Sequence, residues 1–471
     1  MPSFWVGRKE TVKNVSNKIV KITGTPALFC ALVLSLLSCA GGPDVYKDVD
    51  AAVYRNDFEM GLEAIRKGQE GRDPIYPERN TISLFLDRGL LEHYAGSYRE
   101  SSMDLQEAER LIEEAYTRSI TENIASYIAN DNTKTYPGED YEDIYLNVFN
   151  ALNYYNRGDL EGAMVEIRKI TVSNGKLDML SRKYENSRPD IQNWILDQLR
   201  NIGFLQNPDL PRGQAVNFSN SALARYLSLL FYLGDGKGDD ARIEYEQLHA
   251  AYTANPNIYK TPLPVSAAGA MNVPPGIARL NVISFVGLSP IKVEGTFQSV
   301  FPFFQNSYLR TPVFKLPKFT GRNSGITRIE VAVSGKDGFS LELLEDMGAV
   351  MEETYNARFS NLFFKTYIRT LLKYAAADIS ATKIAERGSS SAAALSVIIA
   401  KSTIDASESA DIRMSRYLPD KAYIGGIDLE PGTYTVTVNY LSGGRIIASD
   451  EYRNVTVRPG ALNLIESVSL R

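Results

Sequence analysis

The sequence predicts an α+β protein, in which a region of paired helices is followed by strands with a long helix and then by an antiparallel, sandwich-like β region. Three observations predict this order. Helical periodicity runs from Asp44 to about Asn257, three prolines between residues 256 and 264 break it, and apolar and polar residues alternate from Ala422 onward. The composition, 44% hydrophobic and 23% charged, is that of an ordinary globular protein.

The chain of 471 residues has room for two or three domains. The changes in periodicity place the boundaries. We expect a signal peptide at residues 1–38, helical repeats at 39–257, a linker at 258–275, a mixed strand and long-helix domain at 276–408, and the β region at 409–471.

The first 38 residues have the layout of an export signal. Five basic residues accompany one acidic residue, and residues 27–37 then form an uncharged apolar run of 11 residues. A membrane-spanning helix needs about 20 apolar residues, so this run is too short to cross a bilayer. A basic segment, a short apolar segment and small residues in that order are typical of secretion signals.

Cys39 follows this run in the stretch Leu36-Leu37-Ser38-Cys39-Ala40, which resembles a bacterial lipobox. The resemblance implies cleavage before Cys39 and attachment of a lipid to its thiol, and Ala40 after the cysteine favours the outer membrane, facing the periplasm. The outer leaflet of the inner membrane and the cell surface stay open. The alternative is a buried helix with an inert cysteine. Cys30 would leave with the signal, so the mature chain could form no internal disulfide.

Loss of the signal would leave 46 basic and 55 acidic residues, a formal charge of −9. An acidic chain without a basic block argues against a nucleic-acid partner. We therefore expect the membrane, through the lipid anchor, and unidentified envelope proteins as partners.

Four stretches of the helical region place a short polar turn between two amphipathic helices. They begin at Val53, His93, Asn153 and Phe231. In the third, an apolar stripe with the spacing of one helix face precedes the turn, with Asp140 as the expected cap of its helix. Small residues beyond the turns would let paired helices approach closely.

The third stretch resembles a tetratricopeptide repeat. The signature positions are Tyr154, Gly158, Asp159, Ala163 and Ile167, and Ala241 and Tyr245 match the small and large positions in the fourth stretch. The turns lie 40 to nearly 80 residues apart, and the first two stretches lack the signature alanine. The resemblance therefore implies an irregular TPR-like α-solenoid with inserted helices, one of them around Trp194.

Strands are expected after the prolines, at "ARLNVISFVGLSP" and "ITRIEVAVSGKDG", and a long helix at residues 341–379. Four short strands are expected in the tail, all antiparallel. Two blocks, at residues 138–169 and 409–438, resemble a family of bacterial tetratricopeptide-like lipoproteins without an established activity. Some members accompany genes for activators of cell-wall synthesis, which implies a setting in cell-envelope assembly.

Catalytic and metal motifs are scarce. The two histidines, His93 and His249, have no second ligand at metal spacing and are expected to be packing or surface residues. The stretch "GDGKGDD" from Gly234 has a lysine at the third position of a calcium loop, so we expect a lengthened repeat turn in which Asp239 caps the next helix. We expect no metal and no cofactor.

The sequence thus predicts a lipid-anchored envelope protein that acts as a protein-binding scaffold and is not an enzyme. Two alternatives stay open. One is an envelope hydrolase that cuts peptidoglycan or another glycan with carboxylates in a cleft. The other is a lipoprotein that binds a small ligand.

Overall fold

The computed structural model describes residues 45–119, 132, 134–172, 175–180, 218, 220–298, 309, 311–386, 396–397, 400–401, 403–405 and 407–471. Residues Val45–Arg471 form one compact unit. The expected signal peptide, Cys39 and the inserted helix around Trp194 lie outside the described residues.

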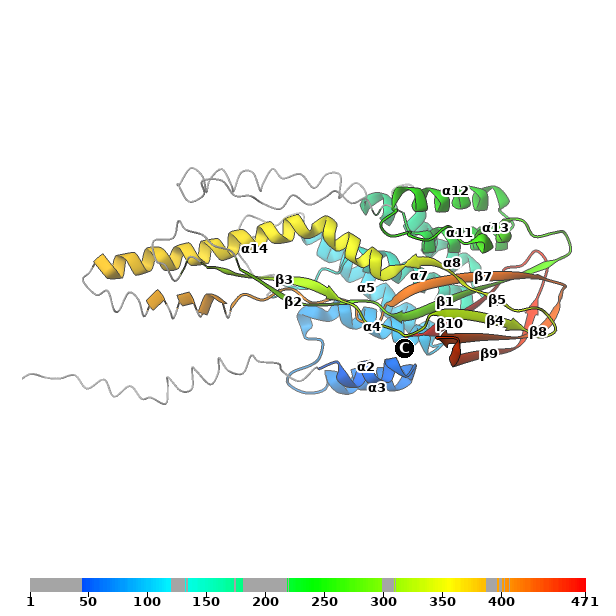
Figure 1. Cartoon of the computed structure of the whole chain (residues 1–471), viewed down its shortest axis with the longest axis horizontal. Helices are drawn as coiled ribbons and strands as arrows, with labels where there is room; N and C mark the ends of the chain where they lie inside the picture. The colour runs from blue at the N-terminus through cyan, green and yellow to red at the C-terminus, as the bar shows by residue number, and fades with distance from the viewer. Residues whose placement is uncertain are drawn as a thin grey trace, which may run out of the picture. The chain divides into compact units, whose positions relative to one another are not determined.

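Each of the four predicted stretches folds as two packed helices joined by a three-residue turn (Figure 1), which confirms the paired helices. Between pairs, the second helix of one packs on the first helix of the next. The pairs are α2 (Lys47–Tyr54) with α3 (Phe58–Gln69), α4 (Thr81–Tyr94) with α5 (Tyr98–Ser119), α7 (Asp140–Asn156) with α8 (Leu160–Thr171), and α11 (Ala222–Gly234) with α12 (Gly238–Ala254).

The four turns share one backbone geometry. Their middle residues, Asn56, Gly96, Gly158 and Gly236, all have φ between 58° and 79°. In each turn the next N–H donates to the carbonyl five residues earlier, as Asp159 does to Tyr154 at 2.9 Å. This bond satisfies a carbonyl left open at the end of a helix, and the left-handed residue makes it reachable. The sequence intervals between the turns differ, but the turn itself does not.

A small buried residue stands four positions after the last turn residue in every pair: Gly61, Ser101, Ala163 and Ala241. Ser101 also donates to the Gly89 carbonyl across its pair at 2.6 Å. Because none of the four has a bulky side chain, the two helices of each pair approach closely. Glycine and serine thus take the place of the missing alanine in the first two pairs.

Two helix starts differ from the sequence prediction. Glu139, not Asp140, is the residue before α7, and Lys237, not Asp239, precedes α12. Both predicted caps lie inside the first turn of their helix, where a carboxylate still interacts favourably with the helix dipole. A short helix, α13 (Val265–Met271), lies in the predicted linker, and the single turn η1 (Glu78–Asn80) precedes α4.

The strands in the described part of the chain form three sheets. The first has the order β10-β1-β7-β6, the second pairs β2 with β3, and the third has the order β5-β4-β8-β9. Their bounds are β1 Ala278–Leu288, β2 Ile291–Gln298, β3 Val313–Thr320, β4 Arg328–Val333, β5 Phe339–Ser340, β6 Glu342–Asp346, β7 Pro419–Leu429, β8 Gly432–Ser442, β9 Arg445–Val457 and β10 Asn463–Ser469.

The expectation of an all-antiparallel tail is wrong for β10, which pairs parallel with β1 from Leu280 to Val286. β9 belongs to a different sheet, so the chain crosses between sheets before β10 instead of turning back in a hairpin. Strands of residues 409–471 also pair with β1, β4 and β6. The predicted boundary at residue 408 therefore runs through shared sheets.

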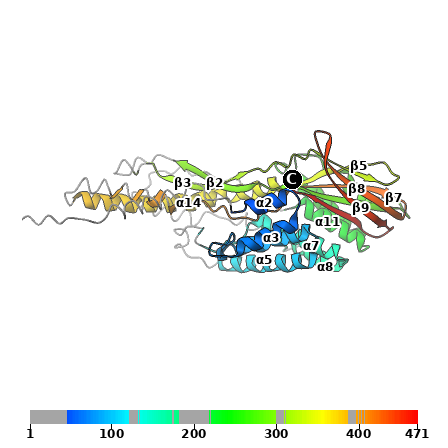
Figure 2. The same ribbon diagram turned by 90° about the horizontal axis from the view of Figure 1, so that it is seen from below.

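The long helix α14 (Met347–Glu386) starts later than predicted, because residues 342–346 add β6 to the edge of the first sheet. No helix in the described part of the chain is both long enough and apolar enough to span a membrane. The main core joins the second, third and fourth helix pairs to β1, β6, β7 and the start of α14, and the first pair packs in a smaller cluster of its own. Figure 2 shows α3, α5, α7 and α8 together on one side of the strands.

Candidate functional site

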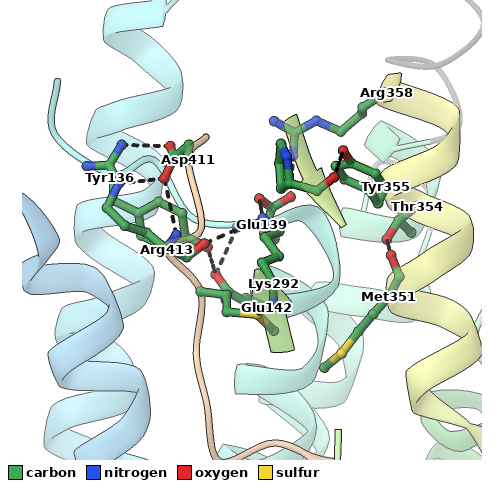
Figure 3. Close-up of polar contacts among 12 residues, drawn as sticks. Tyr136, Glu139, Glu142, Lys292, Met351, Thr354, Tyr355, Arg358, Asp411 and Arg413 are labelled. Carbon is green, nitrogen blue, oxygen red and sulfur yellow. Dashed lines mark hydrogen bonds and ion pairs between the residues drawn. The ribbon is translucent and has the colours of Figure 1, made fainter. Parts of the chain in front are cut away.

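A groove of about 1000 Å³ lies where the helix pairs meet the rest of the chain. Its lining comes from α5, α7, α8, residues 175–180, the loop at residues 134–139, β2, β3, α14 and the segment at residues 411–413. Figure 3 shows part of it, with Tyr355 and Arg358 of α14 on one side and Asp411 and Arg413 on the other. The volume is at the upper end for small-molecule sites.

Glu139 joins the helical region to α14 and β2. Its carboxylate is paired with the buried Lys292 ammonium and accepts a hydrogen bond from Arg358 Nη1 at 2.6 Å. Arg358 also lies 3.9 Å from Asp140. Two cations from distant parts of the sequence therefore hold one carboxylate in place.

Glu109 has the same arrangement on the helical side. Lys169 and Lys176 donate to its two oxygens at 2.7 and 2.8 Å, and Lys176 also donates to Asp143 at 2.7 Å. Burial opposes the charge of Glu109, but the two ammonium groups outweigh it and lower its pKa to about 2. Burial raises the pKa of Asp143, although Lys176 counteracts it.

An extended segment, residues 408–417, crosses beside the groove and is called the strap. At its start Glu408 pairs with Arg369 of α14 at 3.1 Å, and at its end Arg416 pairs with Asp50 of α2 at 2.6 Å. In its middle, Arg413 donates to the carbonyl of Lys134 at 2.7 Å. Ten residues thus connect the long helix, the groove and the first helix pair.

Asp411 and Arg413 form a two-bond pair within the strap, with both distances at 2.8 Å. Burial opposes ionisation of Asp411, but Arg413 outweighs it and lowers the pKa of the carboxyl group. The Arg413 guanidinium lies 5.3 Å from the centre of the Tyr136 ring, a cation–π contact.

Beneath the groove, Glu142 is a buried acceptor for three donors. Tyr136 Oη and Glu139 N donate to one oxygen at 2.8 Å, and Ser415 N of the strap donates to the other at 2.5 Å. Burial, followed by the charge of Glu139, raises the pKa of Glu142 to about 7.

Asp87 of α4 holds the strap in a similar way. It accepts from Ser415 Oγ and Arg416 N, both at 2.7 Å, and from Tyr76 Oη at 2.6 Å. Burial raises the pKa of Asp87 to about 6, despite these hydrogen bonds. The strap is therefore fixed by two carboxylates of the helix pairs.

This arrangement presents fixed, mutually paired charges to the groove. Of its acidic residues, Glu109, Glu139, Asp140, Asp143 and Asp411 each have a cationic partner. Paired groups of this kind offer oriented hydrogen-bond donors and acceptors to a bound molecule. Within the described ranges, no group of three or more histidine, cysteine, aspartate or glutamate side chains could hold a metal ion.

The seven predicted repeat residues lie in the helix pairs and none lines the groove. Asp159 accepts from Gly162 N at 2.8 Å and begins α8. Ala163, Ile167 and Ala241 are buried between helices, whereas Tyr154 and Tyr245 are half-buried. In "GDGKGDD", Lys237 pairs with Asp235 at 2.7 Å.

The two histidines differ. His249 is exposed against the Tyr245 ring. His93 is buried among aromatic rings, with Asn153 at 2.7 Å from Nδ1 and Glu466 of β10 at 2.5 Å from Nε2. Burial opposes the charge of His93, but Glu466 outweighs it and raises the pKa of the imidazole. This contact across 373 residues could not be read from local periodicity.

Sequence reasoning also missed Glu142, Asp87, Lys292 and Arg358. The sequence held one indication of Glu142. It lies in the block at residues 138–169, one of the two blocks with the family resemblance, and it accepts a hydrogen bond from Ser415 in the other block, residues 409–438. Searches against protein-family models, curated proteins and solved structures found no match for this chain.

Proposed function

We propose that this chain is a lipid-anchored envelope protein whose helix pairs form an irregular TPR-like solenoid that binds a partner protein. Cys39 is the anchor, the helix pairs and the groove form the binding region, and the sheets hold that region rigid. The proposal includes an outer-membrane location facing the periplasm and a role in envelope assembly.

The observation that carries the proposal is the repetition of one structural unit. Four helix pairs have the same turn, the same small buried position and the same packing of one pair on the next. Stacked helix pairs bury a shared core and leave an extended surface, which such arrays use to bind other proteins.

The pKa values of the carboxylates in and beneath the groove favour a binding role over catalysis by proton transfer. A general acid needs a carboxyl group whose pKa lies near the working pH. Glu109 and Asp411 instead have lowered pKa values because cations hold them ionised. Glu142, whose pKa is raised to about 7, uses its oxygens to hold Tyr136, the start of α7 and the strap.

The anchor is tested by labelling cells with a radioactive fatty acid and separating membrane from soluble fractions. The wild type and Cys30→Ala, which removes only the cysteine of the expected signal, should both carry label and sediment with membranes. Cys39→Ala should lose the label and its membrane association. Label retained by Cys39→Ala would contradict the anchor.

The scaffold is tested by cross-linking the wild type in intact envelopes, solubilising them and recovering the protein by an affinity tag. A reproducible set of envelope proteins, reduced for Cys39→Ala, is the expected result. Background recovery alone, together with cleavage of a cell-wall substrate by the purified protein, would overturn the scaffold in favour of a hydrolase.

A further inference from the structure

Three large apolar side chains in the groove are exposed to solvent. Tyr116 of α5 is 44% exposed, Val172 at the end of α8 is 44% exposed, and Met179 is 50% exposed. We call these three residues the groove lip. An exposed apolar residue alone is ordinary, but these three line one concave site, where apolar side chains usually contact a ligand.

The lip suits another protein chain better than a sugar. Valine and methionine offer aliphatic surface of irregular shape, which receives leucine-like or aromatic side chains, and methionine is common at surfaces that bind varied peptides. A peptide side chain that leaves water here would gain the free energy of apolar burial.

Glu113 places one exposed carboxylate in the groove, on the helix that also carries Tyr116. It lies on α5 three residues before Tyr116, lines the groove and is exposed. Among the residues that the structure describes it has no ion pair, in contrast to Glu109, which is held by two lysines. Its charge therefore complements a basic residue on a bound chain, and this pair would form at the rim, where ion pairs set specificity.

The groove interior provides fixed partners for a main chain. Arg358, Lys292 and Glu139 are locked to one another, as are Lys176 and Asp143. Groups that are already oriented lose little entropy when a ligand binds. They can take the N–H and C=O groups of an extended peptide without selecting its sequence.

From these observations we propose that the groove binds a peptide segment of a partner protein, with an aliphatic or aromatic anchor residue on the groove lip and a neighbouring lysine or arginine against Glu113. This inference rests on the proposed scaffold function for the existence of a partner. It adds the site and the chemistry of the segment that the site recognises.

The test uses the purified full-length chain in detergent and a phage-displayed library of random 12-residue peptides. Enriched peptides should share an apolar residue next to lysine or arginine. A synthetic peptide of that consensus, labelled with fluorescein, should bind in fluorescence anisotropy. Val172→Asp combined with Met179→Asp should weaken its binding at least tenfold, because the anchor contact is lost. Glu113→Gln should weaken it about threefold, as expected for a rim ion pair.

Matched controls use the same substitutions outside the groove. Val165 and Met103 are 49% and 57% exposed on α8 and α5 and do not line it. Val165→Asp combined with Met103→Asp should leave binding unchanged, as should Glu161→Gln, which alters an exposed glutamate of α8. Circular dichroism melting of each variant checks that the chain is folded.

Three results would overturn the inference: no enriched peptide, equal weakening by the lip and control variants, or binding of a chitin oligosaccharide that the lip variant abolishes, which would make the groove a glycan site. The peptide library is tested on the purified chain alone, so its result does not depend on any other envelope protein. If no peptide is enriched but cross-linking recovers a reproducible set of envelope proteins, the peptide site is rejected and the scaffold function still stands.

Discussion

At the residue scale, buried carboxylates connect segments that are far apart in the sequence. Glu345 of β6 shows the pattern fully. It accepts hydrogen bonds from Tyr145 at 2.8 Å, Tyr259 at 2.7 Å and Ser221 at 3.0 Å, and so joins two helix pairs and a loop to the first sheet. A buried carboxylate is costly unless donors surround it, so each such residue specifies which segments must meet.

The shifted carboxylates predict how stability depends on pH. The pKa of Asp87 rises from 3.8 to about 6 on folding, and that of Glu142 rises from 4.5 to about 7. At these two groups the folded state therefore binds more protons than the unfolded state between about pH 4 and 7, and their contribution to stability is lost as the pH rises through that range. The contribution of His93 to stability also falls as the pH rises, because its pKa is raised on folding.

We expect urea unfolding of the wild type to give a free energy lower at pH 8 than at pH 5 by on the order of 2 kcal/mol. In Glu142→Gln this difference should shrink. The variant should also be less stable at pH 5 by about 1–3 kcal/mol, since an amide has one acceptor oxygen for three donors. Glu161→Gln is the control at an exposed site. An undiminished pH effect in Glu142→Gln would contradict the assignment.

The two histidines form a matched pair for mutation. His93→Ala leaves Glu466, whose side chain is 12% exposed, with a hydrogen bond from Asn156 but without its ionic partner, and should cost about 3–5 kcal/mol in the free energy of unfolding. His249→Ala removes an exposed ring and should change stability by about 0.5 kcal/mol or less. Chemical denaturation at pH 6 measures both. Similar losses in the two variants would show that burial of His93 is not the cause.

At the element scale, the turn between paired helices is the repeated feature. Its left-handed middle residue and the bond back to the preceding helix recur in all four pairs, whereas the residues before and after it vary. Local sequence is sufficient for this feature, because a glycine or asparagine at one position adopts the left-handed conformation that lets the chain turn back into the second helix.

Gly158→Ala tests the turn. Gly158 has φ of 78° and open space where a Cβ would stand, so the substitution adds backbone strain without a clash and should cost about 1–2 kcal/mol. Gly238→Ala has the same open space but no left-handed backbone, and should be neutral or stabilise by up to about 1 kcal/mol. Thermal melting compares them. Equal effects would mean that the turn geometry is not the source of the cost.

At the scale of the whole molecule, three of the helix pairs share one core with the first sheet. Buried residues of α4, α7 and α11 lie in the same cluster as Phe285 of β1, Leu344 of β6 and Ile424 of β7. The strap adds polar contacts to the helix pairs, from Ser415, which donates to Glu142 of α7, to Tyr417, which donates to Asp50 of α2. Neither part therefore has a complete core alone.

Fragments split in the predicted linker should consequently fail to fold separately. Residues 45–275 and 276–471, expressed apart, should show broad thermal transitions and rapid proteolysis, and mixing them should restore part of the native protection. The intact chain should unfold in one calorimetric transition, because the shared core couples the two parts. A fragment 45–275 that melts cooperatively would show that the helix pairs are an independent domain.

The sequence alone determined features that depend on neighbours along the chain. The four helix pairs follow from apolar spacing and turn residues, and the strands at "ARLNVISFVGLSP" and "ITRIEVAVSGKDG" follow from their apolar and β-branched residues and the turn residues that bound them. Glycine at residue 158 and a small residue at 163 serve the same local geometry in the structure. Such features are governed by backbone preference and periodicity, which act within a few residues.

Only the tertiary structure decided the groove and the strap. Nothing near Glu139 in the sequence indicates that Lys292 and Arg358 will hold it, and the parallel pairing of β10 with β1 joins strands about 180 residues apart. These contacts depend on which segments the shared core brings together. A charged residue looks the same in the sequence whether it is solvated or buried against a distant partner, because only packing removes the water around it.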